Sequence, residues 1–484
     1  MVQVNKNYIN GEWVDSKAGV TYQQLNPADL TQVTGVWQKS AVEDVKSAID
    51  AAQKAYMPWS GLAVYKRAEF LKNALALMKQ RIDHIANVLT LENGKTLAES
   101  RGEISSAIKE MDFQIGEGLR LSGEVMPCEQ DGVLAYSIRR PLSVVAVICP
   151  WNFPFNVPCR KITPALMAGN TCILKSAQLT PGVAAEFVKL YEEAGLPAGV
   201  LNFVTGFGSD IGDELVTNRQ IKAISFTGSV EVGQSIHKQA AANMTRTQLE
   251  MGGKNPLVVL ADANLKDAAD SAAFAAYACA GQWCTSTSRA VVEKKVLKDF
   301  TDLLLERVKK IVVGNGLDSK TTMGPVCGKN QLENILAAIE KGKAEGGRLL
   351  AGGNRIVENG LEKGCFIEPT VFADVRPDMF IAQKEIFGPV LSVMSADNFE
   401  HAVEIANAVD FGLTSSVYTN DLQKAFKFIE KTDVGMTHVN MHTAFKEPAL
   451  SFGGVKISGC GIPEAGHTGI EFFTEHKVVY LKYR

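Results

Sequence analysis

The sequence predicts an α/β protein built on two doubly wound parallel sheets, and three observations support this fold class. The chain has 484 residues, of which 46% are hydrophobic, enough for two or three packed domains. Short continuous apolar runs bounded by Gly, Pro or Asn are typical of strands buried on both faces. Amphipathic helical segments lie between these runs, and strands that alternate with helices form parallel sheets.

Composition and charge exclude several classes of partner. Fifty basic and fifty-three acidic residues give a net charge of −3, which indicates neither a nucleic-acid-binding surface nor a polybasic membrane patch. Residues 1–15 lack the basic flank and apolar segment of a signal peptide, and no apolar run approaches the roughly 20 residues that a bilayer helix needs. We therefore expect a soluble, cytoplasmic protein that binds neither nucleic acid nor membrane.

The cysteines and histidines predict neither a disulfide framework nor a metal site. Nine cysteines are an odd number scattered over a long chain, and most are expected to be reduced and buried. The chain contains no C-x-x-C pair, no H-E-x-x-H and no compact cluster among its seven histidines, so no metal is expected. The cysteines are Cys128, Cys149, Cys159, Cys172, Cys279, Cys284, Cys327, Cys365 and Cys460.

The first 120 residues predict mainly helices. Ser40 and Glu43 have the spacing of a capping box and are followed by apolar residues at helical intervals. Residues 65–120 continue the helical pattern, with a break predicted at Asn93-Gly94. The pattern is that of an ordinary amphipathic layer packed on a sheet. Its inward stripe is Leu71, Leu75, Leu77 and Met78.

Buried strands are predicted from residue 142 onward. Helices are expected between them, at 180–193 and 231–241. This rhythm of strand and helix indicates the first doubly wound sheet. The predicted strands are 142–149, 170–175, 200–204, 221–226 and 255–260.

A second alternating set occupies roughly 264–440 and predicts a second α/β domain. The tail, 470–483, alternates apolar with polar residues after a Gly-rich region and predicts a strand. A terminal strand with so many apolar groups needs a sheet to join, in this chain or in another subunit. The elements expected in the second set are helices at 298–312 and 399–409 and strands at 390–395 and 434–440.

Residues 221–233 predict an anion-binding turn. A buried strand runs here into a Gly-containing turn and then a helix, whose N-terminal N–H groups and dipole bind phosphate. Taken alone, the T-G-S-x-x-x-G pattern fits a purely structural turn equally well. Upstream, 206–212 is similar to a dinucleotide fingerprint but has one residue too many between its last two glycines, and we interpret it as a loop.

Three further segments contain groups suited to covalent chemistry. Cys284 in GQWCTSTSR is flanked by small and polar residues, which favour a reactive thiol over a core cysteine. Glu250 precedes a Gly-Gly pair and could act as a general base, although a surface glutamate before a turn is the simpler interpretation. Asn152 in PWNFP follows a buried strand, where its amide could donate to an oxyanion or cap a turn.

Together and in this order, these segments resemble the aldehyde dehydrogenase superfamily over essentially the whole chain. Neither chance nor a shared fold alone would place seven such motifs in register. The resemblance implies an NAD(P)-dependent, hydrolytic aldehyde dehydrogenase with two doubly wound parallel α/β domains and a small β oligomerisation arm. The motifs are PWNFP, ILKSAQLTPG, FTGSVEVG, LEMGGKNP, GQWCTSTSR, EIFGPV and FGGVKISG.

The resemblance assigns the catalytic roles. It implies Cys284 as the nucleophile, Glu250 as the general base and Asn152 as an oxyanion donor beside the backbone N–H of Cys284. The thiolate would add to the aldehyde, hydride would pass to the nicotinamide, and water activated by Glu250 would hydrolyse the thioester. Family branches that pass the acyl group to coenzyme A typically lack a glutamate at this position, so hydrolysis is favoured.

The resemblance also implies a dinucleotide site. Lys175, which we group with both the catalytic and the cofactor-binding residues, would contact the adenosine ribose. Gln178 stands where NAD-specific members usually carry a glutamate, and an amide does not repel a 2′-phosphate, so we expect NADP to be tolerated as well as NAD. The other cofactor-binding residues implied are Trp151, Ser176, Gly208, Gly228, Ser229, Gly233, Glu385 and Phe387.

The substrate is expected to be an anionic semialdehyde. Arg160 occupies a position like the arginine with which succinate-semialdehyde dehydrogenases hold the distal carboxylate, whereas Ala278 stands where that branch has a second arginine. His442 and Lys446 are further candidate partners for an anion, and Trp283 is a candidate apolar wall. Succinic, 2-oxoglutaric and sulfonated semialdehydes all fit. The alternatives are a structural role for Arg160 and a neutral aldehyde as substrate.

The resemblance further implies how the chain divides. The expected NAD(P)-binding domain is 1–121 with 148–252, the catalytic domain is 253–446, and the oligomerisation arm is 122–147 with 463–484. A homodimer or homotetramer follows, since an apolar terminal strand needs an edge to pair with. A non-catalytic protein on the same fold is the alternative from another class, although such a protein need not keep all three catalytic groups.

Overall fold

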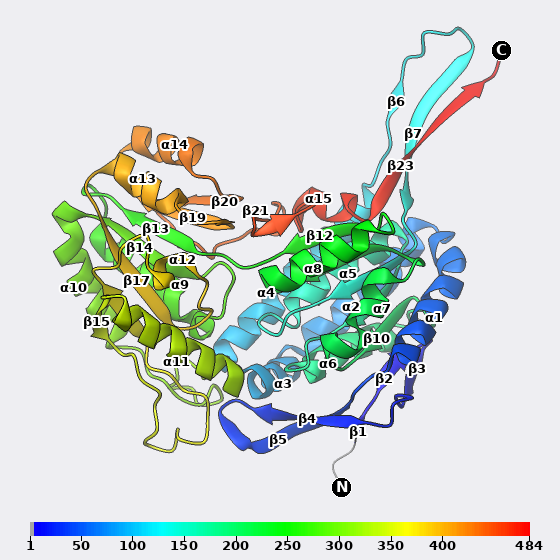
Figure 1. The fold of residues 1–484 in the computed structure, drawn as a ribbon. Helices are drawn as coiled ribbons and strands as arrows, with labels where there is room; N and C mark the ends of the chain where they lie inside the picture. The colour runs from blue at the N-terminus through cyan, green and yellow to red at the C-terminus, as the bar shows by residue number, and fades with distance from the viewer. Residues whose placement is uncertain (1–3) are drawn as a thin grey trace.

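The structure, a computed structural model, describes residues 4–484, and its largest element is an eight-stranded sheet (Figure 1). The strands in spatial order are β22 (Gly459–Cys460), β12 (Arg246–Glu250), β11 (Ile221–Thr227), β8 (Val144–Ile148), β9 (Thr171–Lys175), β10 (Leu201–Val204), β2 (Asn7–Ile9) and β3 (Glu12–Val14). The five central strands run parallel, as the buried apolar runs predict. An antiparallel strand flanks this parallel core on each side, β22 beside β12 and β2 beside β10.

Helices cover both faces of this sheet because its strands are apolar on both faces. Val145 and Val147 pack into one hydrophobic cluster, whereas Val144 and Ala146 pack into the cluster on the opposite face. Helices α2 (Val64–Gln80), α3 (Ile82–Asn93), α4 (Leu97–Leu119), α5 (Asn156–Ala168) and α6 (Pro181–Glu193) contribute to the first cluster, and α1 (Val42–Ser60), α7 (Gly208–Thr217) and α8 (Val230–Ala241) contribute to the second.

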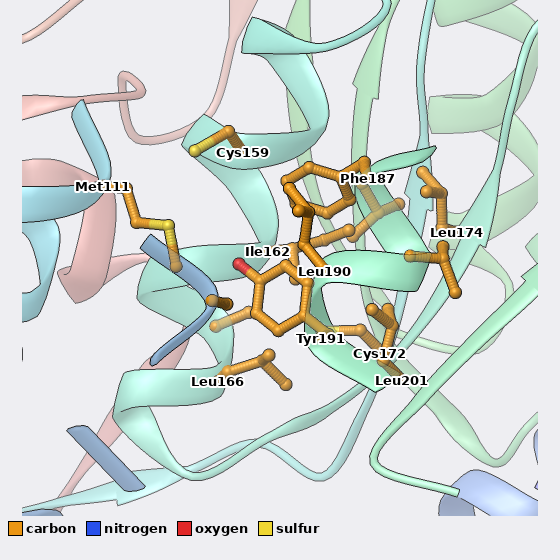
Figure 2. Packing of buried hydrophobic residues seen from close by; sticks show 14 of the residues in the cluster. Met111, Cys159, Ile162, Leu166, Cys172, Leu174, Phe187, Leu190, Tyr191 and Leu201 are labelled. Atoms are coloured by element: carbon orange, nitrogen blue, oxygen red, sulfur yellow. The ribbon is translucent and has the colours of Figure 1, made fainter. Parts of the chain in front are cut away.

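The larger cluster joins helices α4, α5 and α6 to the sheet, as Figure 2 shows. Phe187 and Tyr191 of α6 pack at a tilt with their ring centroids 5.0 Å apart, next to Cys172 and Leu174 of β9. Such close packing fixes the orientation of α5, whose N-terminal turn lies beside the catalytic motifs. The sequence prediction of inert cysteines agrees with the buried position of Cys172.

The second large sheet has seven strands, six of them parallel. The strands in order are β15 (Arg348–Ala351), β16 (Thr370–Ala373), β17 (Val390–Ala396), β14 (Thr287–Glu293), β13 (Asn255–Val259), β19 (Thr414–Tyr418) and β20 (Met436–Val439). The run at 255–260, which the sequence analysis grouped with the strands of the first sheet, forms instead the inner strand β13 of this second sheet, between β14 and β19. The helices of this half are α9 (Leu265–Tyr277), α10 (Leu297–Val308), α11 (Lys329–Ala344), α12 (Phe380–Gln383), α13 (Phe399–Asn407) and α14 (Leu422–Lys431).

A three-stranded antiparallel sheet projects from the body, with the C-terminus at its tip (Figure 1). The predicted terminal strand is β23 (Thr474–Lys482), preceded by helix α15 (Gly466–Glu471), and it pairs with β7 (Val133–Pro141), which pairs with β6 (Val125–Met126). The chain crosses from this sheet into the eight-stranded sheet at 142–143. We call β6, β7 and β23 the arm.

Two smaller sheets and two short 3₁₀ helices complete the described residues. The N-terminal sheet consists of three strands, β1, β5 and β4. In the two-stranded ribbon, β18 pairs with β21. No helix within residues 4–484 combines the length and apolarity needed to cross a bilayer. These elements are β1 (Val4–Asn5), β5 (Asp29–Gln38), β4 (Thr21–Asn26), β18 (Phe411–Gly412), β21 (Val455–Lys456), η1 (Ala278–Gly281) and η2 (Lys294–Val296).

Two further sequence interpretations need correction. The capping box at Ser40 and Glu43 is wrong by one residue, because Ser40 donates its hydroxyl to Asn7 at 3.0 Å. Ala41 is the N-cap of α1 instead, and its backbone N–H donates to Asp44 at 2.8 Å. The loop predicted at 206–212 is also wrong, because helix α7 begins within it at Gly208 and packs its apolar face on the sheet.

Candidate active site

The predicted site residues gather where the two large sheets face each other. In the first sheet, Ile148, Lys175 and Glu250 lie at the carboxyl ends of β8, β9 and β12. Pairing of Ile148 with Lys175 and of Thr227 with Glu250 places these ends along one edge. In the second sheet, Cys284 precedes the amino end of β14. Ligands of open α/β sheets bind outside the carboxyl ends of the strands, so the juxtaposition is that of a binding cleft.

A cavity of about 380 Å³ lies at this junction, and six of the predicted site residues line it. They come from the loop after β8, from α5, from the segment before β14 and from the loop after β20. The volume suits a small organic molecule. The predicted residues in the cavity wall are Asn152, Arg160, Trp283, Cys284, His442 and Lys446.

Cys284 is positioned by a tight segment of chain. Cys279 and Ala280 both have a φ of 53°, which ends helix α9 abruptly and turns the chain toward the cleft. The carbonyl of Cys284 accepts a hydrogen bond from Nδ2 of Asn255 at 2.8 Å. Burial and the nearby carboxylate of Glu385 raise the pKa of the Cys284 thiol to about 12, against the opposing effect of cations. A thiolate at this position therefore requires a base or an added positive charge.

Asn152 lies in the same wall, in the turn between β8 and α5. Its Nδ2 donates to the carbonyl of Gln282 at 3.1 Å, two residues before the cysteine. A carboxamide nitrogen carries two hydrogens, so one remains for an oxygen in the cavity. The hydrogen bond to Gln282 orients this donor without consuming it.

Glu250 is buried at the end of β12, and its side chain is not in the cavity wall itself. Its Oε2 accepts the backbone N–H of Gly454 at 3.2 Å, and a Cβ on Gly453 would collide with its Oε1. Burial, together with the nearby carboxylate of Glu464, raises the pKa of Glu250 well above its usual range. Glu464 does line the cavity, so Glu250 interacts electrostatically with a residue of that wall.

A buried charge cluster surrounds Arg160, and the sequence analysis found only two of its members. Arg160 ion-pairs through Nε with Glu110 at 3.3 Å and through Nη1 with Glu464 at 3.6 Å. Lys446 donates to Glu110 at 2.9 Å, and Lys161 ion-pairs with Glu464. These contacts place three cations against two carboxylates, so the cluster itself retains positive charge.

Glu110, Glu464 and Lys161 carry no motif that could have identified them. Glu110 occupies an ordinary position on the amphipathic helix α4, and Lys161 is one of many helical lysines. Only the packing of the folded chain reveals them. Lys161 directly follows Arg160 in the sequence, whereas Glu110 and Glu464 lie 50 and 304 positions from it. Asn156 was also not predicted as a site residue. Its Oδ1 accepts from Arg160 Nη2 at 2.9 Å and from Lys446 Nζ at 3.1 Å.

Aromatic rings form the remaining wall. Trp283 packs on Phe153 with ring centroids 5.3 Å apart, and His442 packs on Phe274 at 5.0 Å. Burial and the nearby His438 lower the pKa of His442 from its usual range, which favours the uncharged imidazole. The positive charge in the cavity wall therefore comes from Arg160 and Lys446.

The groups predicted to hold the adenosine half of a dinucleotide lie at successive strand ends. Lys175 is the last residue of β9, and burial lowers the pKa of its amine to about 8. The hydroxyl of Ser176 is buried without a hydrogen-bond partner among residues 4–484. Gln178 follows in the same loop, half-buried, and Gly208 is the first residue of α7. An unsatisfied hydroxyl beside an amine suits ribose and phosphate oxygens.

The turn from β11 into α8 has the form that phosphate binding requires. Ser229 is the N-cap of α8, so the free N–H groups of the helix start open toward the cleft. A Cβ on Gly228 would collide with the Phe226 ring, and a Cβ on Gly233 would collide with Met251. Only glycine permits this close approach, and the small turn leaves room for a pyrophosphate.

Glu385, Phe387 and Trp151 lie on the other side of the cleft. The Glu385 Oε1 accepts the backbone N–H of Gly253 at 3.0 Å, and burial raises the pKa of this carboxyl to about 7. Phe387 meets Trp151 edge to face with ring centroids 5.4 Å apart. A carboxylate acceptor beside two rings fits the hydroxyls of a ribose and a flat heterocycle, so the donor set as a whole fits a nicotinamide dinucleotide.

The nine cysteines are all free thiols in the structure, and six of them are buried. Burial raises the pKa of Cys149 to about 12, as expected of an inert core thiol. Across residues 4–484, no group of three or more His, Cys, Asp and Glu side chains is arranged to hold a metal ion.

Comparisons with known proteins agree with this geometry. The model of the aldehyde dehydrogenase family matches residues 13–479. An alpha-ketoglutaric semialdehyde dehydrogenase of Bacillus subtilis is 42% identical over 98% of both chains, and a 2,5-dioxopentanoate dehydrogenase of Saccharolobus solfataricus is 40% identical over 97% of this chain and 98% of its own.

A solved structure gives the same fold. The betaine aldehyde dehydrogenase of Staphylococcus aureus, crystallised with NAD⁺, has a TM-score of 0.97 and 32% identity, covering 100% of this chain and 96% of its own. The matched family, the relatives and the shared fold lead to one conclusion. The chain belongs to the aldehyde dehydrogenase family and is an NAD(P)-dependent aldehyde dehydrogenase.

Proposed function

We propose that this enzyme oxidises an anionic semialdehyde of the 2-oxoglutaric type to the corresponding dicarboxylate. One observation carries the proposal. Arg160 and Lys446 both donate to Oδ1 of Asn156 in the wall of the cavity that Cys284 also lines. The excess positive charge of this cluster favours a substrate with a carboxylate at the end remote from the aldehyde. The names of the Bacillus and Saccharolobus relatives support the same class. Succinic and sulfonated semialdehydes share this anionic chemistry.

Cys284 is proposed as the nucleophile. Its sulfur loses a proton to solvent, which the positive charge of a nicotinamide held nearby would favour, and then bonds to the aldehyde carbon. The carbonyl oxygen becomes an alkoxide, which the free N–H of Asn152 and the backbone N–H of Cys284 stabilise. A nicotinamide held by Trp151, Glu385 and Phe387 would supply the hydride acceptor, and loss of hydride from this carbon would leave a thioester on Cys284.

Glu250 is proposed to drive hydrolysis. A water molecule attacks the thioester carbon while Glu250 accepts its proton, and the carbon–sulfur bond breaks to release the acid and the thiolate. The hydrogen bond from Gly454 and the glycine at 453 hold the carboxylate in a space where a larger residue would displace it. Coenzyme A is the competing acceptor. The buried base favours water, and a product assay with and without coenzyme A separates the two.

The cofactor-binding residues proposed are Lys175, Ser176, Gln178, Gly208, Gly228, Ser229 and Gly233 for the adenosine diphosphate half, and Trp151, Glu385 and Phe387 for the nicotinamide half. Gln178 bears no charge, so NADP is proposed as a substitute for NAD. Lack of turnover with NADP at saturating concentration would remove this part of the proposal.

We also propose that the arm joins subunits in a homodimer or homotetramer. β23 is an outer strand of the arm, with one edge free of pairing among residues 4–484, and the outer strand β20 has a free edge on the seven-stranded sheet. Val478 and Tyr480 of β23 are 58% and 72% exposed. Exposed apolar side chains on an unpaired edge favour association with a second copy. The nine free thiols favour a reducing compartment, which supports the cytoplasm.

A panel of aldehydes tests the proposal. Succinic, glutaric and 2-oxoglutaric semialdehydes are compared with pentanal, each with NAD and with NADP, by the absorbance of the reduced nicotinamide. We expect kcat/KM for the acidic aldehydes to exceed that for pentanal by at least about tenfold, the value of one charged hydrogen bond. Equal values for pentanal and the acids would refute the anionic substrate.

A further inference from the structure

Asn156 contains an unsatisfied donor in the wall of the substrate cavity. The residue is the first of helix α5, is 2% exposed and lines the cavity together with Cys284 and Arg160. Its Nδ2 has no hydrogen-bond acceptor among residues 4–484. A buried amide without an acceptor is costly unless a ligand supplies one, and most buried polar groups are satisfied.

The orientation of this amide is fixed by charge. Its Oδ1 accepts from two cationic donors, Arg160 at 2.9 Å and Lys446 at 3.1 Å. If the amide were rotated by half a turn, its NH₂ group would face both cations and accept from neither of them. The two cations therefore keep the oxygen on their own side and leave both N–H bonds of Asn156 for another group.

The backbone of Asn156 is fixed as well. Its N–H donates to Oε1 of Glu103 at 3.0 Å, and the same oxygen accepts the N–H of Phe155 at 2.9 Å. Glu103 is in turn ion-paired with Lys95, which is also buried. The first turn of α5 is thus anchored from two sides, and the side chain of Asn156 cannot move away from the cavity without breaking these contacts.

We propose that Asn156 determines specificity by donating a hydrogen bond to the 2-oxo group of the substrate. The inference rests on the proposed function, because it assigns the groups of a 2-oxo acid semialdehyde to this one cavity. Arg160 and Lys446 attract the carboxylate, and the neutral N–H of Asn156 is adjacent to both. In a 2-oxo acid, the ketone oxygen is a neutral acceptor directly beside the carboxylate. It would therefore face the N–H of Asn156 when the carboxylate faces Arg160 and Lys446. Succinic and glutaric semialdehydes have no such oxygen.

Two five-carbon substrates isolate this contact. 2-Oxoglutaric semialdehyde and glutaric semialdehyde have the same length, aldehyde and carboxylate, and they differ only in the oxygen at carbon 2. We expect the wild-type enzyme to favour the 2-oxo substrate by about tenfold in kcat/KM, the value of a well-aligned neutral hydrogen bond. The variants Asn156→Leu and Asn156→Asp should lose this preference, so that the ratio approaches one.

The aspartate variant separates the donor from the scaffold. The carboxylate introduced by Asn156→Asp still accepts from Arg160 and Lys446, but it has no N–H, so any preference that survives in this variant cannot come from the donor and would overturn the proposal. Ser106→Ala is the matched control, because Ser106 lines the same cavity and its hydroxyl is lost without touching Asn156. Its ratio should equal that of the wild type. A ratio lost in Ser106→Ala and kept in Asn156→Leu would also overturn the proposal.

A binding readout covers variants with little activity. The products 2-oxoglutarate and glutarate differ in the same oxygen, and thermal-shift titration should show tighter binding of 2-oxoglutarate by the wild type and equal binding by Asn156→Leu. Failure of the proposed function has a different signature, in which the wild-type enzyme oxidises pentanal as well as either acid. If both acids are preferred over pentanal and the ratio between them is the same in every variant, only the role of Asn156 is refuted.

Discussion

Arg160 contacts two carboxylates, one amide and the face of the Phe452 ring, whose centroid lies 4.5 Å from its guanidinium carbon. We predict that Arg160→Leu raises KM for 2-oxoglutaric semialdehyde by about 10- to 100-fold, because a charged hydrogen bond to the substrate is lost. KM for pentanal should change little.

The control for this prediction is Arg160→Lys, which keeps the charge without the planar fork and should give an intermediate KM. Steady-state kinetics measures KM for 2-oxoglutaric semialdehyde and for pentanal in each variant. Equal increases for the acid and for pentanal would show that Arg160 only supports the fold around Glu110 and Glu464.

Glu250 should control the pH dependence of hydrolysis. Its pKa is raised, so the carboxyl is protonated and inactive at low pH, and the rate of thioester hydrolysis should rise with pH until the carboxylate predominates. In Glu250→Gln this rise should disappear and hydrolysis should slow by about 10²- to 10⁴-fold.

Rapid-mixing experiments measure the effect directly. Glu250→Gln should release a burst of reduced nicotinamide equal to the enzyme concentration, followed by a slow phase, and the acyl group should be found on Cys284 by mass spectrometry. A normal steady-state rate with an unchanged pH profile would contradict a role as base.

At the residue scale, the sequence predicted the catalytic groups better than their surroundings. Cys284, Glu250 and Asn152 stand in short segments whose neighbours are unusual, with glycines, prolines or small polar residues. The partners of Arg160 stand in segments without a motif. Glu110 on helix α4 and Glu464 lie far from Arg160 in sequence, and even Asn156, on the same helix as Arg160, is identified only by the way its amide faces Arg160 and Lys446 in the folded protein.

At the scale of the element, the start of helix α5 depends on a buried charge. Glu103 accepts two N–H groups at its start and pairs with Lys95, whose amine also lies 3.6 Å from the centroid of the Phe153 ring. Glu103→Leu leaves a buried cation unpaired, which typically costs about 3–5 kcal/mol. We predict a clear fall in the Tm of this variant.

The double variant Lys95→Met with Glu103→Leu should recover more than half of that loss, since it removes the isolated charge and fills the space with apolar atoms. Thermal unfolding followed by circular dichroism measures both. A double variant as unstable as Glu103→Leu would show that the hydrogen bonds to α5, rather than the ion pair, dominate.

Elements with continuous apolar runs were predicted within one or two residues, as in β8, β9 and β10. Strand β14 was missed because it begins with Thr287, Ser288 and Arg289, whose polar groups are not those of an apolar run. Arg289, for example, is satisfied only in the folded protein, where it donates to three backbone carbonyls. The start of α1 was displaced by one residue because Ser40 pairs with Asn7 rather than with the helix.

At the scale of the whole molecule, the arm should decide assembly. Val478→Asp with Tyr480→Asp places two charges on the exposed apolar strand, and we predict a shift from an oligomer toward the monomer because like charges on a buried edge are destabilising. Sedimentation velocity measures the change.

His476→Ala, in the same strand, is the control and should assemble like the wild type. An unchanged sedimentation coefficient for the charged variant would exclude the arm as the joining surface. The division of the chain stays a prediction. It assigns 1–121 with 148–252 to a cofactor-binding domain, 253–446 to a catalytic domain and 122–147 with 463–484 to the arm.

Architecture at this scale was predictable because alternation of strand and helix leaves few solutions once the buried runs are found. How the two sheets face each other was not. Their relative placement depends on contacts such as Asn152 to Gln282 and Cys279 to Glu99, which join segments far apart in the chain. The cleft that these contacts create is a property of the folded protein alone.

The most direct test concerns the sulfur atom of Cys284. Production of reduced nicotinamide from 2-oxoglutaric semialdehyde is measured for the wild type and for Cys284→Ala, with dinucleotide binding followed by fluorescence to show that the variant remains folded. The predicted result is unaltered binding of the dinucleotide and a rate lower by about 10⁴-fold or more, as for other lost nucleophiles. Oxidation by Cys284→Ala at the wild-type rate would contradict covalent catalysis at this residue.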